Sequence, residues 1–144
     1  MKDKKHVVIL EDSVNIAKNI EQDLKTIYPE ATFLHFRYPC EGISYISSKI
    51  LNGDISNESE WLIITGMEMR YSSYDGLDPK AGEVVLKNLR LGKRDMDVIV
   101  VSPRELNLSD MKTIYRNVIG VVKSKSLFDE NDCDMISQYK AFLN

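Results

Sequence analysis

The 144-residue sequence has little cysteine, little histidine and no long apolar run. Its two cysteines, Cys40 and Cys133, are far apart and form no CxxC pattern, so we expect two free, buried thiols in a reducing compartment. Its two histidines, His6 and His35, lack the spacing of metal ligands. No run approaches the ~20 apolar residues of a membrane span, and the apolar run near the start is too short for a signal peptide. The sequence therefore predicts a soluble, cytoplasmic chain without a membrane partner.

A surplus of basic residues is also missing. The formal net charge is -3 and the isoelectric point about 5.4, which argues against direct binding of nucleic acid. The hydrophobic fraction of 43% and the charged fraction of 28% are ordinary for a globular protein. Residues 1–144 are therefore expected to form one domain with a sizeable core.

Short apolar runs alternate with segments of helical periodicity. The predicted strands cover residues 6–10, 31–36, 61–65, 97–101 and 119–122. The residues predicted to face inward from the helices are Ile16, Ile20, Leu24 and Ile27; Ile43, Ile46 and Ile50; Val85, Leu86 and Leu89; Met111, Ile114, Tyr115 and Val118; and Phe128, Ile136, Tyr139 and Leu143. This order predicts an α/β fold: a (βα)5 doubly wound, five-stranded parallel sheet with helices on both faces.

Several local signals mark where these elements stop and start. Gly92 fits the residue that closes the third helix, and "SLFD" (126–129) fits a capping box that opens the last one. The polar segment 51–60 is predicted to be a loop, and so is the longer segment 70–82, which is rich in Ser, Gly, Asp and Pro. The overlapping residues 69–74 are either a partner-binding loop or a polar loop with packed tyrosines.

Polar residues follow four of the predicted strands at their carboxyl ends. Glu11 and Asp12 stand at the end of the first strand, and Thr65 and Gly66 stand at the end of the third. Ser102 stands at the end of the fourth strand and Lys123 at the end of the fifth. Because the carboxyl ends of parallel strands share one edge of the sheet, we expect an acidic pair, a hydroxyl and a lysine to converge there.

Four stretches resemble the receiver domain of bacterial two-component response regulators, and the resemblance covers nearly the whole chain. They are "VVILEDS", "GEVVLKNLR", "VIVVSP" and "GVVKS". The resemblance implies a flavodoxin-like receiver fold, with Glu11 and Asp12 at the Mg²⁺-binding pair, Ser102 at the Ser/Thr position and Lys123 at the invariant lysine. It also implies partners: a histidine kinase, an output domain or another receiver, with a homodimer possible and residues 107–142 as the docking face.

The sequence departs from this family at the position that should carry the phosphoryl group. Matching Met69 to the methionine of the family pattern D-x-x-M-P puts Gly66 at the acceptor aspartate, and a shift of one residue puts Thr65 there. Neither is a carboxylate, so no acyl phosphate can form, and Mg²⁺ loses one ligand and should bind weakly at best. Gly120 stands where the family has an aromatic residue, and Ser124 where it has a proline.

The favoured prediction is therefore a pseudo-receiver that is not an enzyme, needs no cofactor and acts by phosphorylation-independent protein–protein interaction. One alternative is phosphorylation at a non-standard site, Asp75, Asp78 or Thr65. Glu68 as a built-in phosphate mimic is another. A small-molecule-binding flavodoxin-like domain is a third, although "EDSVN" offers acidic charge where a bound phosphate would need backbone N–H groups.

The edge residues also have plainer roles that remain open. Glu11 and Asp12 either bind Mg²⁺ weakly or form an acidic turn that caps the first helix. Lys123 either forms an ion pair with that acidic pair or faces solvent, and Ser102 is either a vestigial switch residue or a cap for the turn before Pro103.

Overall fold

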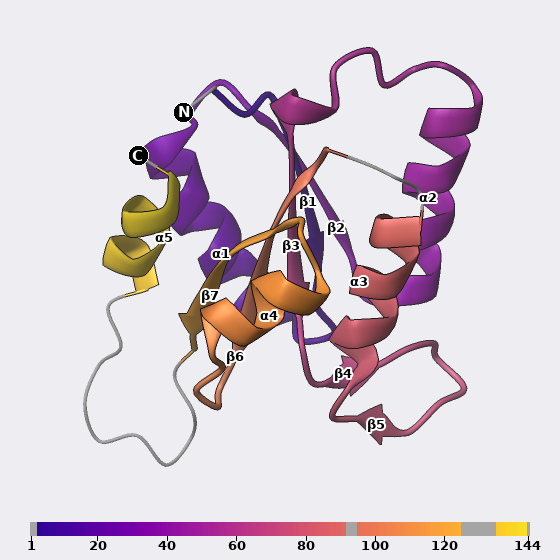
Figure 1. The fold of residues 1–144 in the computed structure, drawn as a ribbon, viewed down its shortest axis with the longest axis vertical. Helices are drawn as coiled ribbons and strands as arrows, with labels where there is room; N and C mark the ends of the chain where they lie inside the picture. The colour runs from indigo at the N-terminus through magenta and orange to yellow at the C-terminus, as the bar shows by residue number, and fades with distance from the viewer. Residues whose placement is uncertain (1–2, 92–94, 125–134, 144) are drawn as a thin grey trace.

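The computed structural model describes residues 3–91, 95–124 and 135–143, and its centre is a five-stranded sheet (Figure 1). The strands follow the order β2-β1-β3-β6-β7 and all pair in parallel. They are β1 (His6–Leu10), β2 (Thr32–Phe36), β3 (Trp61–Gly66), β6 (Asp97–Ser102) and β7 (Val118–Lys123). The predicted doubly wound parallel sheet is confirmed.

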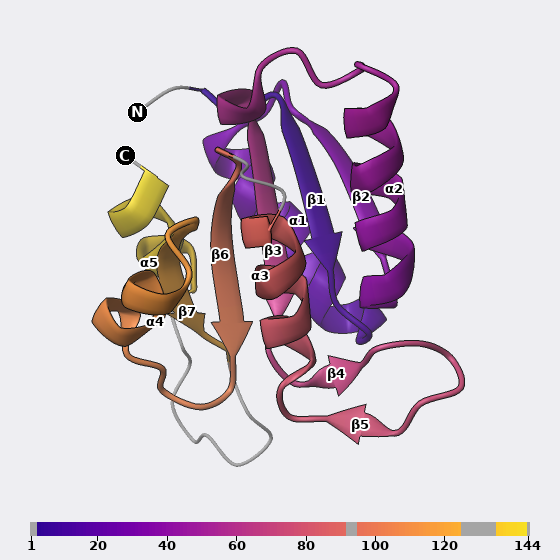
Figure 2. The ribbon, with the colours of Figure 1, turned by 45° about the vertical axis from the view of Figure 1, so that its right-hand side comes forward.

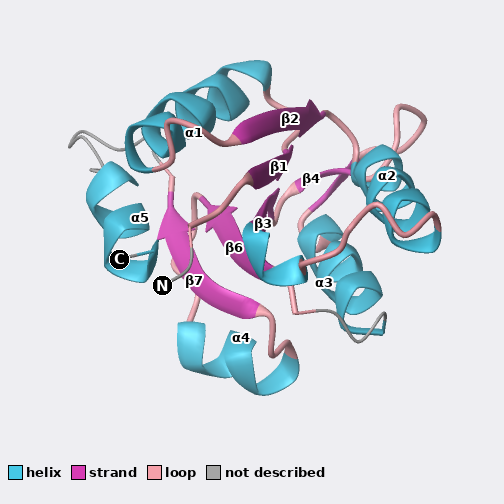
Figure 3. Cartoon of the chain, turned by 90° about the horizontal axis from the view of Figure 1, so that it is seen from above, coloured by secondary structure: helices cyan, strands magenta, loops and turns pink. Residues whose placement is uncertain are grey.

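Helices cover both faces of the sheet, as the view along the strands shows (Figure 3). The helices α1 (Val14–Ile27) and α5 (Met135–Leu143) pack on one face, and α2 (Pro39–Leu51), α3 (Ala81–Leu91) and α4 (Leu108–Ile114) pack on the other. Neighbouring strand residues alternate between the two: Ile9 belongs to the α1/α5 core, whereas Val8 belongs to the opposite core. Burial on both faces explains why the central strands are continuous apolar runs rather than alternating ones.

The fourth helix is shorter than its apolar pattern predicts. The helix α4 ends at Ile114, Tyr115 caps it, and Val118 already begins β7. The expectation that Ile114 faces inward and that Val118 is helical is therefore wrong, since Ile114 is 54% exposed. An apolar residue at a boundary satisfies both a helical and a strand period, so the pattern could not locate the break.

Part of the predicted loop 70–82 forms a small antiparallel hairpin instead. Its strands β4 (Met69–Arg70) and β5 (Leu77–Asp78) lie beyond the carboxyl ends of the central strands (Figure 2). Met69 is fully buried and anchors the hairpin in the core, whereas Tyr74 in its turn is 98% exposed. The hairpin therefore extends the carboxyl edge of the sheet, and Tyr74 is not one of the packed tyrosines that one alternative predicted.

Some sequence predictions fall outside the described residues: Gly92, the 126–129 capping box, Phe128 and Cys133. Among the described residues, Cys40 is a free thiol, as predicted, but it is half-buried rather than buried. The segment 51–60 is irregular except for the end of α2 and a 3₁₀ turn, η1 (Glu58–Glu60). Across the described ranges, no helix combines the length and the apolarity that crossing a membrane requires.

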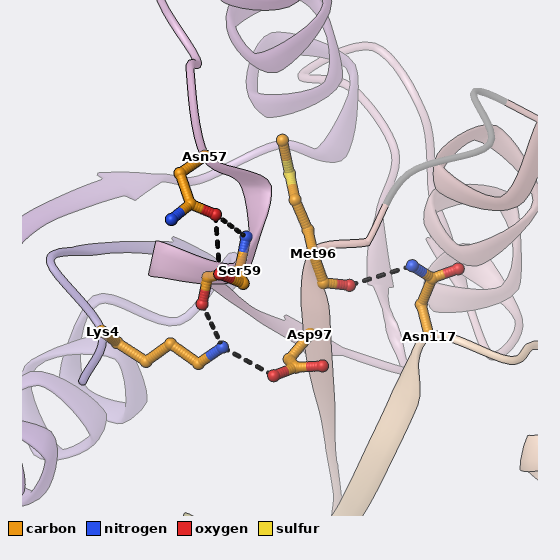
Figure 4. A network of polar contacts seen from close by, with 6 residues as sticks. All are labelled: Lys4, Asn57, Ser59, Met96, Asp97 and Asn117. Atoms are coloured by element: carbon orange, nitrogen blue, oxygen red, sulfur yellow. Dashed lines mark hydrogen bonds and ion pairs between the residues drawn. The ribbon is translucent and has the colours of Figure 1, made fainter. Parts of the chain in front are cut away.

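The buried lysine Lys4 forms polar contacts with two other segments at the amino edge of the sheet (Figure 4). The Lys4 side chain is 1% exposed, and its Nζ lies 2.6 Å from Asp97 Oδ2 and donates to the Ser59 carbonyl oxygen at 2.7 Å. The Asn117 amide donates to the Met96 carbonyl oxygen at 2.9 Å in the same region. These contacts fix the segments that precede β1, β3, β6 and β7, and so fix the register that reaches the opposite edge.

Candidate functional site

The sheet register brings Glu11 beside Gly66. Leu10 pairs with Thr65 in the parallel β1–β3 ladder, so the next residues of the two strands, Glu11 and Gly66, are neighbours. A Cβ atom added to Gly66 would meet Glu11 Oε2, with Met69 Sδ 3.6 Å away. The Glu11 carboxyl therefore fills the space that a side chain at position 66 would need.

Glu11 is a buried carboxyl with an unusual proton affinity. The residue is only 5% exposed, and its Oε1 accepts a hydrogen bond from the Ser13 N–H at 3.1 Å. Burial raises the pKa of the Glu11 carboxyl to about 8; the Ser13 N–H lowers it and the Asp12 charge raises it, both by less. At neutral pH the group is therefore mostly protonated and uncharged.

The second acidic residue, Asp12, is held by an arginine. Its Oδ2 accepts the Arg70 backbone N–H at 3.3 Å and lies 3.9 Å from Arg70 Nε. Arg70 is the residue that stands at the proline of the family pattern. A cationic side chain thus already lies beside the Asp12 carboxylate.

A second arginine pairs with the third carboxylate of the edge. Arg104 Nε, in the loop after β6, lies 2.5 Å from Glu68 Oε1. Glu68 is half-buried and lines the same cavity as Glu11 and Asp12, a small space of about 180 Å³ with the apolar walls Ile16, Leu77, Val101 and Pro103. Glu68 therefore lies beside Glu11 and Asp12 at the carboxyl edge, and its charge is paired with that of Arg104.

Lys123 does not join the acidic pair. Within the described chain, no ion pair connects its Nζ to Glu11 or Asp12, and it lines a separate cavity of about 200 Å³ with Ser102, Arg104 and Gln138. Its backbone is fixed to α5, because the Lys123 N–H donates to Gln138 Oε1 at 2.8 Å. The predicted ion pair with the acidic cluster is wrong for this structure, and the polar edge is divided into an acidic and a basic part.

Ser102 has the plainer of its two predicted roles. Its Oγ accepts the Arg104 N–H at 3.1 Å, which caps the turn around Pro103. The cap that opens α1 comes from Ser13, whose Oγ accepts the Ile16 N–H, while Glu11 accepts the N–H of Ser13 itself. Ser13 therefore caps α1, and the alternative in which Glu11 and Asp12 cap this helix is wrong, because the Glu11 carboxyl accepts the Ser13 N–H and Asp12 accepts the Arg70 N–H.

The residues proposed as alternative phosphorylation sites are not assembled with Lys123. Thr65 is fully buried, and its Oγ1 donates to the Gly66 carbonyl oxygen at 2.9 Å. Asp75 accepts from Ser72 Oγ at 2.7 Å, and Asp78 accepts the Lys80 N–H at 2.8 Å, both on the exposed hairpin. Neither aspartate folds back to the edge to replace the missing carboxylate.

Gly120, where the family has an aromatic residue, lies under a ring that comes from elsewhere. A Cβ atom on Gly120 would collide with the ring of Phe142, which packs onto β7 from α5. An aromatic side chain at residue 120 has no room there, and a rotating ring of the family's kind is absent from this strand.

The residues present do not fit a magnesium site. Across residues 3–91, 95–124 and 135–143, no three His, Cys, Asp or Glu side chains gather as metal ligands. Asp12 already faces Arg70, and Gly66 supplies no third carboxylate beside the acidic pair. Both features oppose a hard divalent cation, which prefers several ionised oxygen ligands.

Sequence reasoning missed the two arginines that neutralise this edge. Arg70 lies 58 residues from Asp12 along the chain. Its only sequence signal was its place in the D-x-x-M-P pattern, where a cation replaces proline. Arg104 follows Ser102 by two residues and carried no signal of its own.

Solved structures resemble this fold although the sequences differ widely. A response regulator receiver domain from Rhodospirillum rubrum aligns with a TM-score of 0.66 at 16% identity, over 95% of this chain and 92% of its own. A response regulator from Thermotoga maritima, solved in complex with Mg²⁺ and beryllofluoride, gives 0.57 at 19% identity over 96% and 99%. A signal receiver domain from Vibrio parahaemolyticus gives 0.60 at 16% identity over 96% and 88%.

Sequence comparison finds no such relative. No family model matches the chain, and no curated protein matches it. The comparisons therefore concern the arrangement of the elements rather than the residues of the site: the chain has the flavodoxin-like fold of receiver domains, as predicted.

Proposed function

We propose that this chain is a receiver-type module of two-component signalling that acts through protein–protein contact without taking up a phosphoryl group. In this proposal it is a pseudo-receiver of the cytoplasm and not an enzyme. Its partner is a histidine kinase, an output domain or another receiver, including a second copy of itself. The receiver fold supports the first part, and the chemistry of the carboxyl edge supports the second.

One observation carries the proposal: the acceptor position has no side chain, and a buried carboxyl fills its space. Phosphoryl transfer to a receiver needs an ionised carboxylate at that position to attack phosphorus. Gly66 offers none, and Glu11 is a poor substitute because burial raises its pKa to about 8. Its protonated form lacks the negative charge that makes a carboxylate a nucleophile.

The surrounding groups support the same conclusion. In a phosphorylated receiver, a divalent cation and a lysine neutralise the charge that develops on the phosphoryl group. Here Asp12 and Glu68 face Arg70 and Arg104, and Lys123 lines a different cavity. The parts needed to bind and stabilise a transferring phosphoryl group are therefore either absent or engaged elsewhere.

Incubation with acetyl phosphate and Mg²⁺ tests the proposal. We expect the intact protein to keep its mass, whereas the Thermotoga maritima regulator, whose structure holds Mg²⁺ and beryllofluoride, serves as the control that the reagent works. A base-labile, acid-stable gain of one phosphoryl group on this chain would overturn the proposal. Peptide mapping of such a product would identify the phosphorylated residue.

A further inference from the structure

Two arginine side chains lie against the ring of Tyr38 at the carboxyl edge of the sheet. The guanidinium carbon of Arg37 is 5.6 Å from the ring centroid, and that of Arg70 is 5.8 Å from it. Both distances fall within the ~6 Å range of cation–π attraction. The Tyr38 ring therefore lies within the cation–π range of both guanidinium groups.

Contacts from four parts of the chain fix this group. Arg37 Nε donates to the Asp12 carbonyl oxygen at 3.3 Å, and the Arg70 N–H donates to Asp12 Oδ2 at 3.3 Å. The Cys40 N–H, at the start of α2, donates to the Tyr71 carbonyl oxygen at 3.3 Å. These contacts come from the end of β1, the end of β2, the start of α2 and the hairpin, and they hold the Arg37 side chain and the Arg70 backbone beside Asp12.

The two arginines keep most of their hydrogen-bonding capacity. A guanidinium carries five N–H donors, and the exposed Arg37 uses one of them on a backbone oxygen. Within the described part of the chain, Arg37 pairs with no carboxylate. Arg70 is 38% exposed, and its 3.9 Å separation from Asp12 exceeds the length of a hydrogen bond.

We propose that Arg37, Tyr38 and Arg70 form a docking site for an acidic segment of a partner protein. This inference rests on the proposed function, because that function makes the ligand a protein. Guanidinium groups bind carboxylates through paired N–H donors, and the tyrosine ring offers an apolar surface beside them. The Asp12 carboxylate offsets one of the two positive charges, so binding should be moderate and weakened by salt.

Titration of the ¹⁵N-labelled protein with an end-capped hexaglutamate peptide tests this site. In ¹H–¹⁵N spectra at low salt, we expect saturable shifts of the Arg37 and Arg70 Nε–Hε signals and of the Tyr38 amide, and none with hexalysine. The double variant R37Q/R70Q should bind the peptide at least tenfold more weakly. Its amide spectrum away from these residues should stay unchanged, which shows that it folds.

The matched control is R116Q, because Arg116 is an exposed arginine that pairs with Asp95, a residue before β6 at the amino edge of the sheet. R116Q should bind hexaglutamate as the unaltered chain does. Undiminished binding by R37Q/R70Q, or an absence of shifts in the unaltered chain, would overturn the proposal. So would equal shifts with inorganic phosphate at the same concentration, which would indicate a site for a free anion. The acetyl phosphate assay reports on Gly66 and this titration on Arg37, so the two proposals fail separately.

Discussion

The Glu11 carboxyl lies in the space that a side chain on Gly66 would occupy. Glu11 directly follows β1 and Gly66 ends β3, so the two residues meet at the carboxyl edge of the sheet. The two residues are coupled. A larger residue at position 66 requires Glu11 to move, and a smaller residue at position 11 leaves a gap beside the glycine.

Gly66→Ala should destabilise the fold because its methyl group meets Glu11 Oε2. Because the Glu11 carboxyl is the end of a flexible side chain that can partly move aside, we expect a cost near the lower end of the range for overpacking, about 1 kcal/mol of the free energy of unfolding. In an E11A background the same change should cost about 1 kcal/mol less, since the obstructing carboxyl is gone. Urea unfolding of the two single variants and the double variant measures this coupling.

Gly76→Ala is the control for that experiment, because nothing lies within 4 Å of a Cβ atom at Gly76. Its free energy of unfolding should stay within about 0.5 kcal/mol of that of the unaltered chain. Equal costs for Gly66→Ala in both backgrounds would contradict the described contact between Glu11 and position 66.

The stability of the fold should fall between about pH 5 and pH 8 because of Glu11. Burial raises its folded-state pKa from 4.5 to about 8, so between these values the folded chain holds a proton that the unfolded chain has released. The stabilisation from this proton is complete below about pH 4.5 and is lost as the pH rises through 8. Its full size is a few kcal/mol.

Glu11→Gln keeps the shape of the side chain and removes the titration. Unfolding in urea at several values between pH 6 and pH 9 should show a shallower decline for E11Q than for the unaltered chain, with E11Q the more stable above pH 8. Parallel curves for the two proteins would mean that Glu11 titrates normally.

Magnesium should stabilise this chain very little. If its dissociation constant exceeds ~10 mM, then 10 mM Mg²⁺ adds less than about 0.4 kcal/mol to the free energy of unfolding. Replacing the arginine that faces Asp12, as in R70Q, should increase the stabilisation by Mg²⁺. A large stabilisation of the unaltered chain in thermal unfolding would show that the acidic pair still binds the metal.

The buried ion pair at the amino edge should be sensitive to which partner is removed. Asp97→Ala leaves the Lys4 ammonium, 1% exposed, without its counter-charge, and should cost about 3 kcal/mol. Lys4→Met removes the charge but keeps an apolar stem, and Asp97 is already 29% exposed, so this change should cost clearly less. Urea unfolding ranks the two, and a larger cost for Lys4→Met would contradict the account.

The strands could be predicted because they depend on local sequence. A buried apolar run such as residues 61–65 predicts a strand without knowledge of its neighbours in the sheet. The absence of a nucleophilic side chain at position 66 likewise follows from the glycine alone. The residue that fills the space beside Gly66 could not be predicted, since Glu11 reaches it only through the β1–β3 register.

The ion pairs at the carboxyl edge of the sheet could not be predicted from the sequence either. An isolated Arg70 or Arg104 reads as a surface cation, and its pairing with Asp12 or Glu68 depends on the β4–β5 hairpin and on the loop after β6. The hairpin itself joins two strands of two residues each, which is too short for any periodicity to indicate.

Tyr139 offers a test of the packing that holds α5 against the sheet. Its side chain is fully buried with Ile9, Ala17 and Ile20, and within the described chain its hydroxyl has no hydrogen-bond partner. A buried hydroxyl without a partner costs about 1–3 kcal/mol, so Tyr139→Phe should leave the free energy of unfolding unchanged or raise it by up to about 2 kcal/mol.

Tyr139→Ala removes the ring as well and should cost about 3–5 kcal/mol, because it leaves a cavity between α1, α5 and the sheet. The comparison separates the ring from the hydroxyl by urea unfolding at one pH. If Tyr139→Phe instead lost 1 kcal/mol or more, the hydroxyl would have a partner such as a buried water. The core beneath Glu11 would then be polar, and the desolvation that raises the Glu11 pKa would be smaller than the structure indicates.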